Sequence, residues 1–184
     1  MNNTQNPSAV RSKIMITEAL LKLMNVHPYQ EITVKQIILE TNLVRKTFYR
    51  NFSSKDDVLD SIITKKIEEY ANEIISSPLR PLPVIFSFCD RNRDLLLLLH
   101  KNNLLHLLLM KLNVMIPQLN LITDRSNNTF KELIGDLEPD YLIAFNIGAI
   151  WNVIFKWVDR GMTDPADEIK NTIEVYLSRI SPFS

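Results

Sequence analysis

The chain is poor in residues that many catalytic and cross-linked folds require. Its 184 residues include one cysteine, three glycines and three histidines. One cysteine cannot close a disulfide within the chain. The sequence has no Gly-rich phosphate loop, no His-Glu-x-x-His pair and no nucleophile elbow, so we expect no enzyme, no catalytic residue and no cofactor. His100 and His106 lie six residues apart without companion Cys or acidic ligands, so no metal site is expected either.

Segments that would direct the chain to a membrane are also missing. The first eight residues are polar and lack the apolar stretch of a signal peptide. The most apolar run, Leu95 to Met110, is interrupted by His100 and Lys101 and falls short of the about 20 residues that span a bilayer. We therefore expect a cytoplasmic protein without membrane contact.

The charges that the chain does carry are unevenly distributed, although the formal net charge is zero. Residues 1–66 hold 10 Lys and Arg against 6 Asp and Glu, a net charge of +4, whereas residues 67–184 hold 11 against 15, a net charge of −4. A basic first part suggests a module that faces a polyanion such as nucleic acid. With 46% hydrophobic residues and little glycine, the composition itself predicts a compact all-α protein.

The first part of the chain has the pattern of a helix-turn-helix. Apolar residues at helical spacing predict a helix over 11–26. Thr33 is placed to cap a second helix with Gln36 as its capping-box partner, and a third helix is expected from about Val44. Asn42 tolerates the left-handed conformation and permits a sharp turn between the second and third helices. Two short helices joined in this way are typical of DNA-binding proteins.

The rest of the chain is expected to be helical too. A long helix should connect the motif to a second domain, and a segment with three prolines, Ser76 to Pro83, marks the boundary. Beyond it, periodicity and caps predict helices over 83–91, 93–101, 104–121, 139–160 and 165–180. The expected organisation is a helix-turn-helix domain over 10–53, a connecting helix over 54–75 and a helical dimerisation and effector-binding domain over 82–184.

The segment from Thr33 to Asp60 resembles the DNA-binding signature of the Tet repressor family. Members typically show Thr-Val at the start of the motif, Thr-Phe-Tyr in the recognition helix, Phe three residues later and a Lys-acidic pair opening the next helix. The chain has these residues at Thr33-Val34, Thr47-Phe48-Tyr49, Phe52 and Lys55-Asp56. It departs from the pattern at Ile38, Asn42 and Val44, where a small residue, Gly and Ser are usual. The resemblance covers about residues 10–66 and implies a regulator that binds double-stranded DNA at a pseudo-palindromic operator.

The residues expected to contact DNA follow from helix geometry. On a helix that begins at Val44, basic and aromatic side chains share one side, while Phe48 and Phe52 point into the core. Residues near the start of a recognition helix read base edges, so Arg45 and Lys46 are expected to bind guanine. The remaining candidates position the protein, mainly on phosphates. The full predicted set is Thr33, Lys35, Arg45, Lys46, Thr47, Tyr49, Arg50 and Lys55. The alternative is that the basic residues are only a solvated surface and Tyr49 belongs to the core.

The family resemblance also implies a role for the second domain. Its last two helices, over 139–180, would pair with those of a second subunit and form a homodimer. Apolar or soft side chains predicted to line an effector pocket are Phe86, Phe88, Cys89, His106, Met110 and Trp151. The alternative is that they are ordinary core or interface residues. The predicted function is a transcriptional repressor released by a small-molecule effector, with an activator or a protein-binding coregulator of the same family as the alternative.

Overall fold

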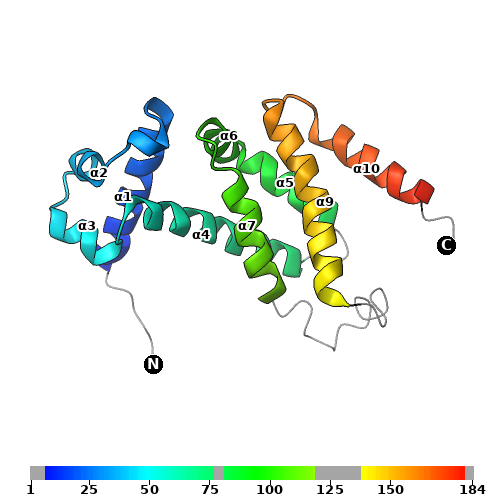
Figure 1. Ribbon diagram of the computed structural model, residues 1–184, viewed down its shortest axis with the longest axis horizontal. Coiled ribbons are helices and arrows are strands. Elements are labelled where there is room, and N and C mark those ends of the chain that lie inside the picture. Colours follow the sequence, from blue (N-terminus) through cyan, green and yellow to red (C-terminus); the bar gives the residue numbers. More distant parts are fainter. Residues whose placement is uncertain (1–6, 77–80, 119–137, 181–184) are drawn as a thin grey trace. The chain divides into compact units, whose positions relative to one another are not determined.

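The computed structural model describes residues 7–76, 81–118 and 138–180, and within these ranges every regular element is a helix (Figure 1). The chain forms two compact units, Met1–Lys66 and Ile67–Ser184. The all-α prediction is therefore confirmed. The dividing line falls inside the helix that the sequence predicts as the connector, so this helix contributes its first half to unit 1 and its second half to unit 2.

Unit 1 is a small bundle around one long helix. Its elements are α1 (Pro7–Val26), η1 (Tyr29–Glu31), α2 (Val34–Thr41), α3 (Arg45–Asn51) and the first half of α4 (Lys55–Ser76). The first helix packs against both α2 and α3. Ile16 and Leu20 of α1, Ile37 of α2 and Phe48 of α3 are completely buried at their junction. These apolar contacts fix the two short helices, which would be too short to be stable alone.

The turn between α2 and α3 has the geometry that the sequence predicts. Thr33 and Gln36 form a capping box at the start of α2, and Asn42 ends the helix in the left-handed conformation, with φ of 54°. A side chain with a short polar arm such as Asn tolerates this region, so glycine is not required here. The helix-turn-helix prediction is confirmed in its caps and in its turn.

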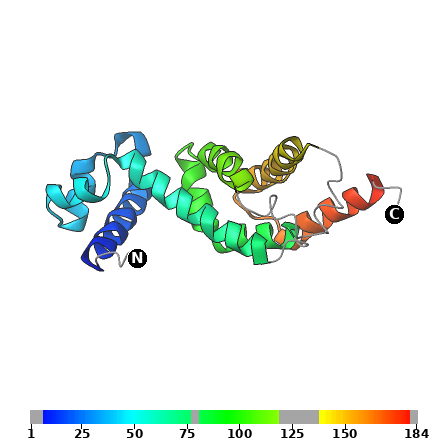
Figure 2. The ribbon, with the colours of Figure 1, turned by 90° about the horizontal axis from the view of Figure 1, so that it is seen from below.

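Unit 2 is built from the second half of α4 and the later helices. These are α5 (Pro81–Arg91), α6 (Arg93–Lys101), α7 (His106–Met115), η2 (Ile116–Gln118), α9 (Pro139–Asp159) and α10 (Ala166–Ile180). The predicted ranges agree with these bounds to within three residues, apart from the end of the 104–121 prediction, which lies outside the described residues. α9 packs against α6 and α7, and α10 packs along α5 (Figure 2).

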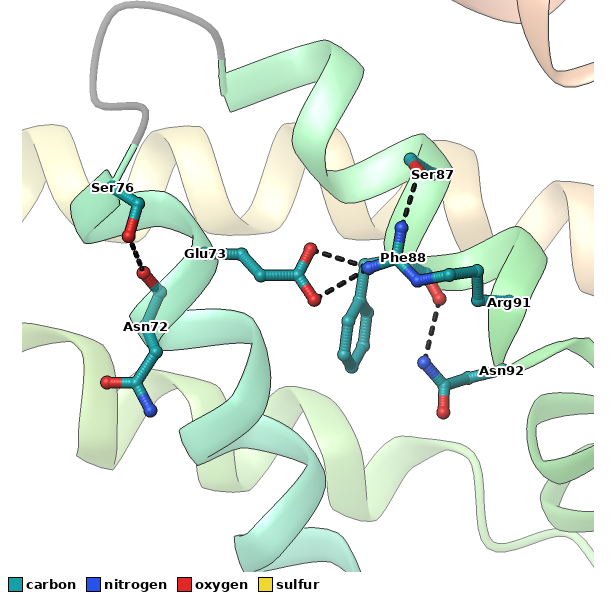
Figure 3. Close-up of polar contacts among 7 residues, drawn as sticks. All are labelled: Asn72, Glu73, Ser76, Ser87, Phe88, Arg91 and Asn92. Atoms are coloured by element: carbon teal, nitrogen blue, oxygen red, sulfur yellow. Dashed lines mark hydrogen bonds and ion pairs between the residues drawn. The ribbon is translucent and has the colours of Figure 1, made fainter.

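Aromatic side chains form the centre of unit 2. The ring of Tyr70 on α4 lies 5.3 Å from that of Phe88 on α5 and 6.4 Å from that of Trp151 on α9. A polar contact accompanies them, because the Arg91 guanidinium binds both carboxylate oxygens of Glu73 at 2.6 Å (Figure 3). Arg91 also donates to the Ser87 hydroxyl, 2.6 Å away. The second half of α4 is thus anchored on α5 by stacking and by a charge-assisted pair.

The last two helices leave much apolar surface uncovered. α10 buries none of its side chains, and on α9 the side chains of Tyr141 and Phe145 are 79% and 72% exposed. By length and composition alone, the segment Asp140–Asp159 could cross a membrane, and 33% of that window is buried in the structure. Helices α6 and α7 would meet the same criterion of length and composition only if they were counted as one span. The two helices are bent by 118° where they meet. A core helix of a soluble protein satisfies this criterion equally well.

Candidate DNA-binding surface

The recognition helix α3 is held by its aromatic side chains. Phe48 is fully buried and Phe52, the residue that ends α3, is 5% exposed. Their rings are 6.3 Å apart, and the Tyr49 ring meets Phe48 edge-on at 5.3 Å. Because Phe48 faces α1, the residues on the opposite side of α3 must face solvent. The backbone of α3 is therefore fixed, while its outer side is free for a partner.

The outer side of α3 presents a basic and aromatic face. Arg45, Lys46, Tyr49 and Arg50 are all exposed, as the sequence predicts, and their spacing places them on one side of the helix. The Arg45 guanidinium lies 5.4 Å from the centre of the Tyr49 ring and 3.4 Å from its hydroxyl. Within the described part of the chain, Lys46 and Arg50 have no ion-pair partner. Thr47 is half-buried beside this face.

The start of α2 adds a second candidate contact. The backbone N–H and the hydroxyl of Thr33 both donate to the Gln36 side-chain oxygen at 2.7 Å, and the Gln36 N–H donates back to the Thr33 hydroxyl at 3.3 Å. The Thr33 hydroxyl is therefore engaged within its own capping box. Lys35 is exposed in the first turn of α2, two residues after this cap. Both residues lie in unit 1, and Lys35 has no ion-pair partner among the described residues.

Lys55 is the first residue of α4, and its ammonium group is engaged within unit 1. Its ammonium donates to the carbonyl oxygens of Tyr29, Gln30 and Ile32 at 2.7, 3.0 and 2.8 Å. An ammonium group has three protons, and three acceptors already take them. A phosphate contact by Lys55 would require its ammonium to give up one of these carbonyls. The expectation of such a contact came from the place of Lys55 at the start of α4, and a sequence pattern cannot show that three carbonyls converge there.

Two apolar residues of the motif are exposed, and one of them, Val44, is a position where the sequence departs from the family pattern. Leu39 on α2 is 65% exposed, and Val44, which precedes the first residue of α3, is 68% exposed. Val44 occupies the N-cap of α3 and supplies no side-chain cap. Valine is among the poorest residues for an N-cap. The departure at Val44 is therefore also a departure from good capping, and functional sites often break local rules.

The residues predicted to line an effector pocket divide into a buried group and an exposed group. Phe86, Phe88, Cys89 and Trp151 are at most 5% exposed and pack as core, whereas His106 and Met110 point outward. A shallow depression on the described surface lies instead along α10, lined by Asn171, Thr172, Val175, Tyr176 and Arg179. Burial raises the pKa of the Cys89 thiol to about 12, with a smaller contribution from Asp90. This thiol is therefore inert near neutral pH. No three His, Cys, Asp or Glu residues in the described ranges are grouped to hold a metal.

Comparisons with known proteins agree with this geometry. Residues 16–62 match the family model described as bacterial regulatory proteins, tetR family. The fold resembles that of the dihydroxyacetone kinase operon activator DhaS, with a TM-score of 0.61 and 20% sequence identity over 95% of this chain and 99% of that chain. No curated protein sequence matches the chain. The matched segment runs from the core of α1 into α4 and contains both helices of the motif. Unit 1 therefore carries a helix-turn-helix that matches the model of the tetR family of bacterial regulatory proteins.

Proposed function

We propose that the protein is a homodimeric, cytoplasmic repressor that inserts α3 into the major groove of a pseudo-palindromic operator. The observation that carries this proposal is the outer face of α3. It presents three exposed cations, Arg45, Lys46 and Arg50, on a helix whose inner side is anchored by the buried Phe48. Exposed cations on a rigid helix are what direct readout of guanine and binding of phosphate require.

The residues divide by their place on the helix. Arg45 and Lys46 form its first turn and are the base-reading pair, because the start of a recognition helix approaches the base edges. Arg50 lies in the last turn and, with Lys35, contacts phosphates. Tyr49 supports Arg45 through the ring contact and binds backbone through its hydroxyl. Thr47 contributes a methyl group between these contacts.

The test is selection of a binding site from random DNA, followed by footprinting and titration. Arg45→Ala should weaken binding to the selected site by about 1–3 kcal/mol, roughly 5- to 150-fold, and change binding to random DNA far less. Lys101→Ala, which removes an exposed cation from α6 of unit 2, is the matched control. Equal losses on the selected and random sequences for Arg45→Ala would contradict a base-reading role. Failure to select any sequence would contradict the proposed function itself.

The uncovered apolar surface of α9 and α10 supports a second copy of the chain as the partner. On α10, Tyr176 and Ile180 lie on one stripe and are 60% and 55% exposed. On α9, no atom of the described residues lies within 4 Å of the position that a Cβ on Gly148 would take, so another helix can approach closely there. A two-fold dimer also matches the symmetry of a pseudo-palindromic site. The two helices of each copy would together form a four-helix contact.

Repression is the role that these surfaces support directly. Occupying an operator blocks transcription with DNA binding and dimerisation alone, whereas activation needs a further surface for another protein. The activator alternative is favoured by one finding, the name of DhaS, which describes that protein as an operon activator. A reporter gene placed behind the selected operator separates the two roles. Lower expression in the presence of the protein supports a repressor, and higher expression supports an activator.

An effector would release the repressor by acting on unit 2. If it used the predicted residues, it would have to open the packed core, because Phe86, Cys89 and Trp151 are at most 2% exposed. Binding to such an opened state would change the environment of Trp151. Quenching of tryptophan fluorescence by candidate molecules, together with loss of operator binding, is the measurement that identifies an effector.

A further inference from the structure

Lys55 and two neighbours form a polar contact that joins the first turn of α4 to the η1 segment. We call Tyr29, Lys55 and Asp56 the α4 clasp. The Lys55 ammonium donates to three carbonyls of the segment 29–32 and lies 4.6 Å from the centre of the Tyr29 ring. The Tyr29 hydroxyl donates to the Asp56 carboxylate at 2.5 Å. Two consecutive residues of α4 therefore hold the same short segment.

Two of the three residues of the α4 clasp are shielded from solvent, unlike the partners of an exposed surface ion pair. Tyr29 is 6% exposed and Lys55 is half-buried. Three carbonyl dipoles that converge on one point repel each other unless a cation sits among them, and the ammonium fills that place with one proton for each oxygen. Burial and the bond to Asp56 raise the pKa of the Tyr29 hydroxyl well above its usual value, so it stays a donor.

The segment that the clasp holds leads directly into the DNA-binding motif. Ile32, whose carbonyl oxygen accepts a hydrogen bond from Lys55, precedes Thr33, which caps α2. The clasp thus fixes the start of α2 against the start of α4, within unit 1. A phosphate could recruit the ammonium only by displacing carbonyls that already satisfy it. From this geometry we infer that Lys55 is a positioning residue, which holds the entry to α2 in place for DNA and does not itself bind a phosphate. The inference rests on the proposed function.

The first test measures lysine reactivity in the intact protein. Each lysine is acetylated with the N-hydroxysuccinimide ester of acetate, with and without a selected operator, and quantified by mass spectrometry. Lys46, which is exposed, is the internal control. We expect Lys55 to react slowly in both states, and Lys46 to react quickly alone and slowly on DNA. A Lys55 that reacts as quickly as Lys46 in the free protein and becomes protected by DNA would overturn the inference. If DNA protects neither Lys46 nor Lys35, the proposed function fails, and this outcome is recognised independently of Lys55.

The second test uses the salt dependence of operator binding. Loss of one phosphate contact lowers the slope of log affinity against log salt by about one. Lys55→Met should weaken binding and leave this slope unchanged. Tyr29→Phe keeps every cation and breaks only the bond to Asp56, so it remains informative if Lys55→Met fails to fold. It should weaken operator binding about two- to tenfold, the range that corresponds to one net hydrogen bond, again with an unchanged slope. A reduced slope for Lys55→Met, or unaltered binding by Tyr29→Phe, would contradict the positioning role.

Discussion

Replacing Phe145 by alanine tests whether α9 carries the dimer contact. The Phe145 side chain is 72% exposed in the single chain, so its truncation should cost the isolated fold little. Burying a whole phenylalanine side chain contributes about 1.5–3 kcal/mol, and the exposed part makes about 1–2 kcal/mol of this available to a partner. A two-fold interface contains the residue twice. The dimer should therefore lose about 2–4 kcal/mol, which corresponds to a dissociation constant about 30- to 1,000-fold higher.

Sedimentation velocity over a range of concentrations measures this dissociation constant. Val26→Ala is the matched control, because Val26 is 71% exposed but lies at the end of α1 in unit 1. Gly148→Leu is a second probe, since the single chain has open space for the new side chain whereas a closely packed partner helix would not. An unchanged dissociation constant for Phe145→Ala, or equal effects of Phe145→Ala and Val26→Ala, would show that this face of α9 is not the interface.

Three further predictions concern single residues. Val44→Ser supplies the missing N-cap of α3 and should raise the free energy of unfolding by about 0.5–1 kcal/mol in urea titrations; a loss of stability would contradict our description of that cap. Gln36→Glu keeps the capping box but places a negative charge near phosphates, so operator affinity should fall about fivefold while the thermal midpoint is maintained; unchanged affinity would show that the start of α2 lies away from DNA. The Cys89 pKa rises from 9.0 to about 12 on folding, so the folded state holds its proton where the unfolded state has lost it, and stability should decline between about pH 9 and pH 12. Cys89→Ala should make that decline shallower, and an identical decline in both proteins would contradict this assignment.

The helix-turn-helix was predictable because its determinants are local. Thr33 and Gln36 cap α2 through residues three positions apart, and Asn42 reaches the left-handed region without help from distant residues. The exposed face of α3 followed from the same reasoning, since the burial of Phe48 fixes which side looks outward. Periodicity and caps that act over a single helical turn are the signals that a sequence expresses most directly.

The features that could not be predicted depend on contacts between distant segments. The position of Lys55 on the sequence indicates a helix start, but its acceptors lie 23 to 26 residues away. The predicted pocket illustrates the same limit, because periodicity could not distinguish a lining side chain from a packed one. Phe86 is 2% exposed and Met110 is 62% exposed, although both are apolar residues within predicted helices. Tertiary packing decides such cases.

The division of the chain inside α4 has a consequence for how the protein can be cut and recombined. Unit 1 ends at Lys66 and unit 2 begins at Ile67, in the middle of a continuous helix. A cut at that point would leave the carbonyls of the last turn of unit 1 without the amide partners that the next turn provides. The piece from Ile67 onward would keep Tyr70 and Glu73, but on a helix that lacks the turn before them. Exchange of DNA-binding domains between relatives should therefore succeed only when the junction lies outside α4, so that the exchanged part contains the whole helix.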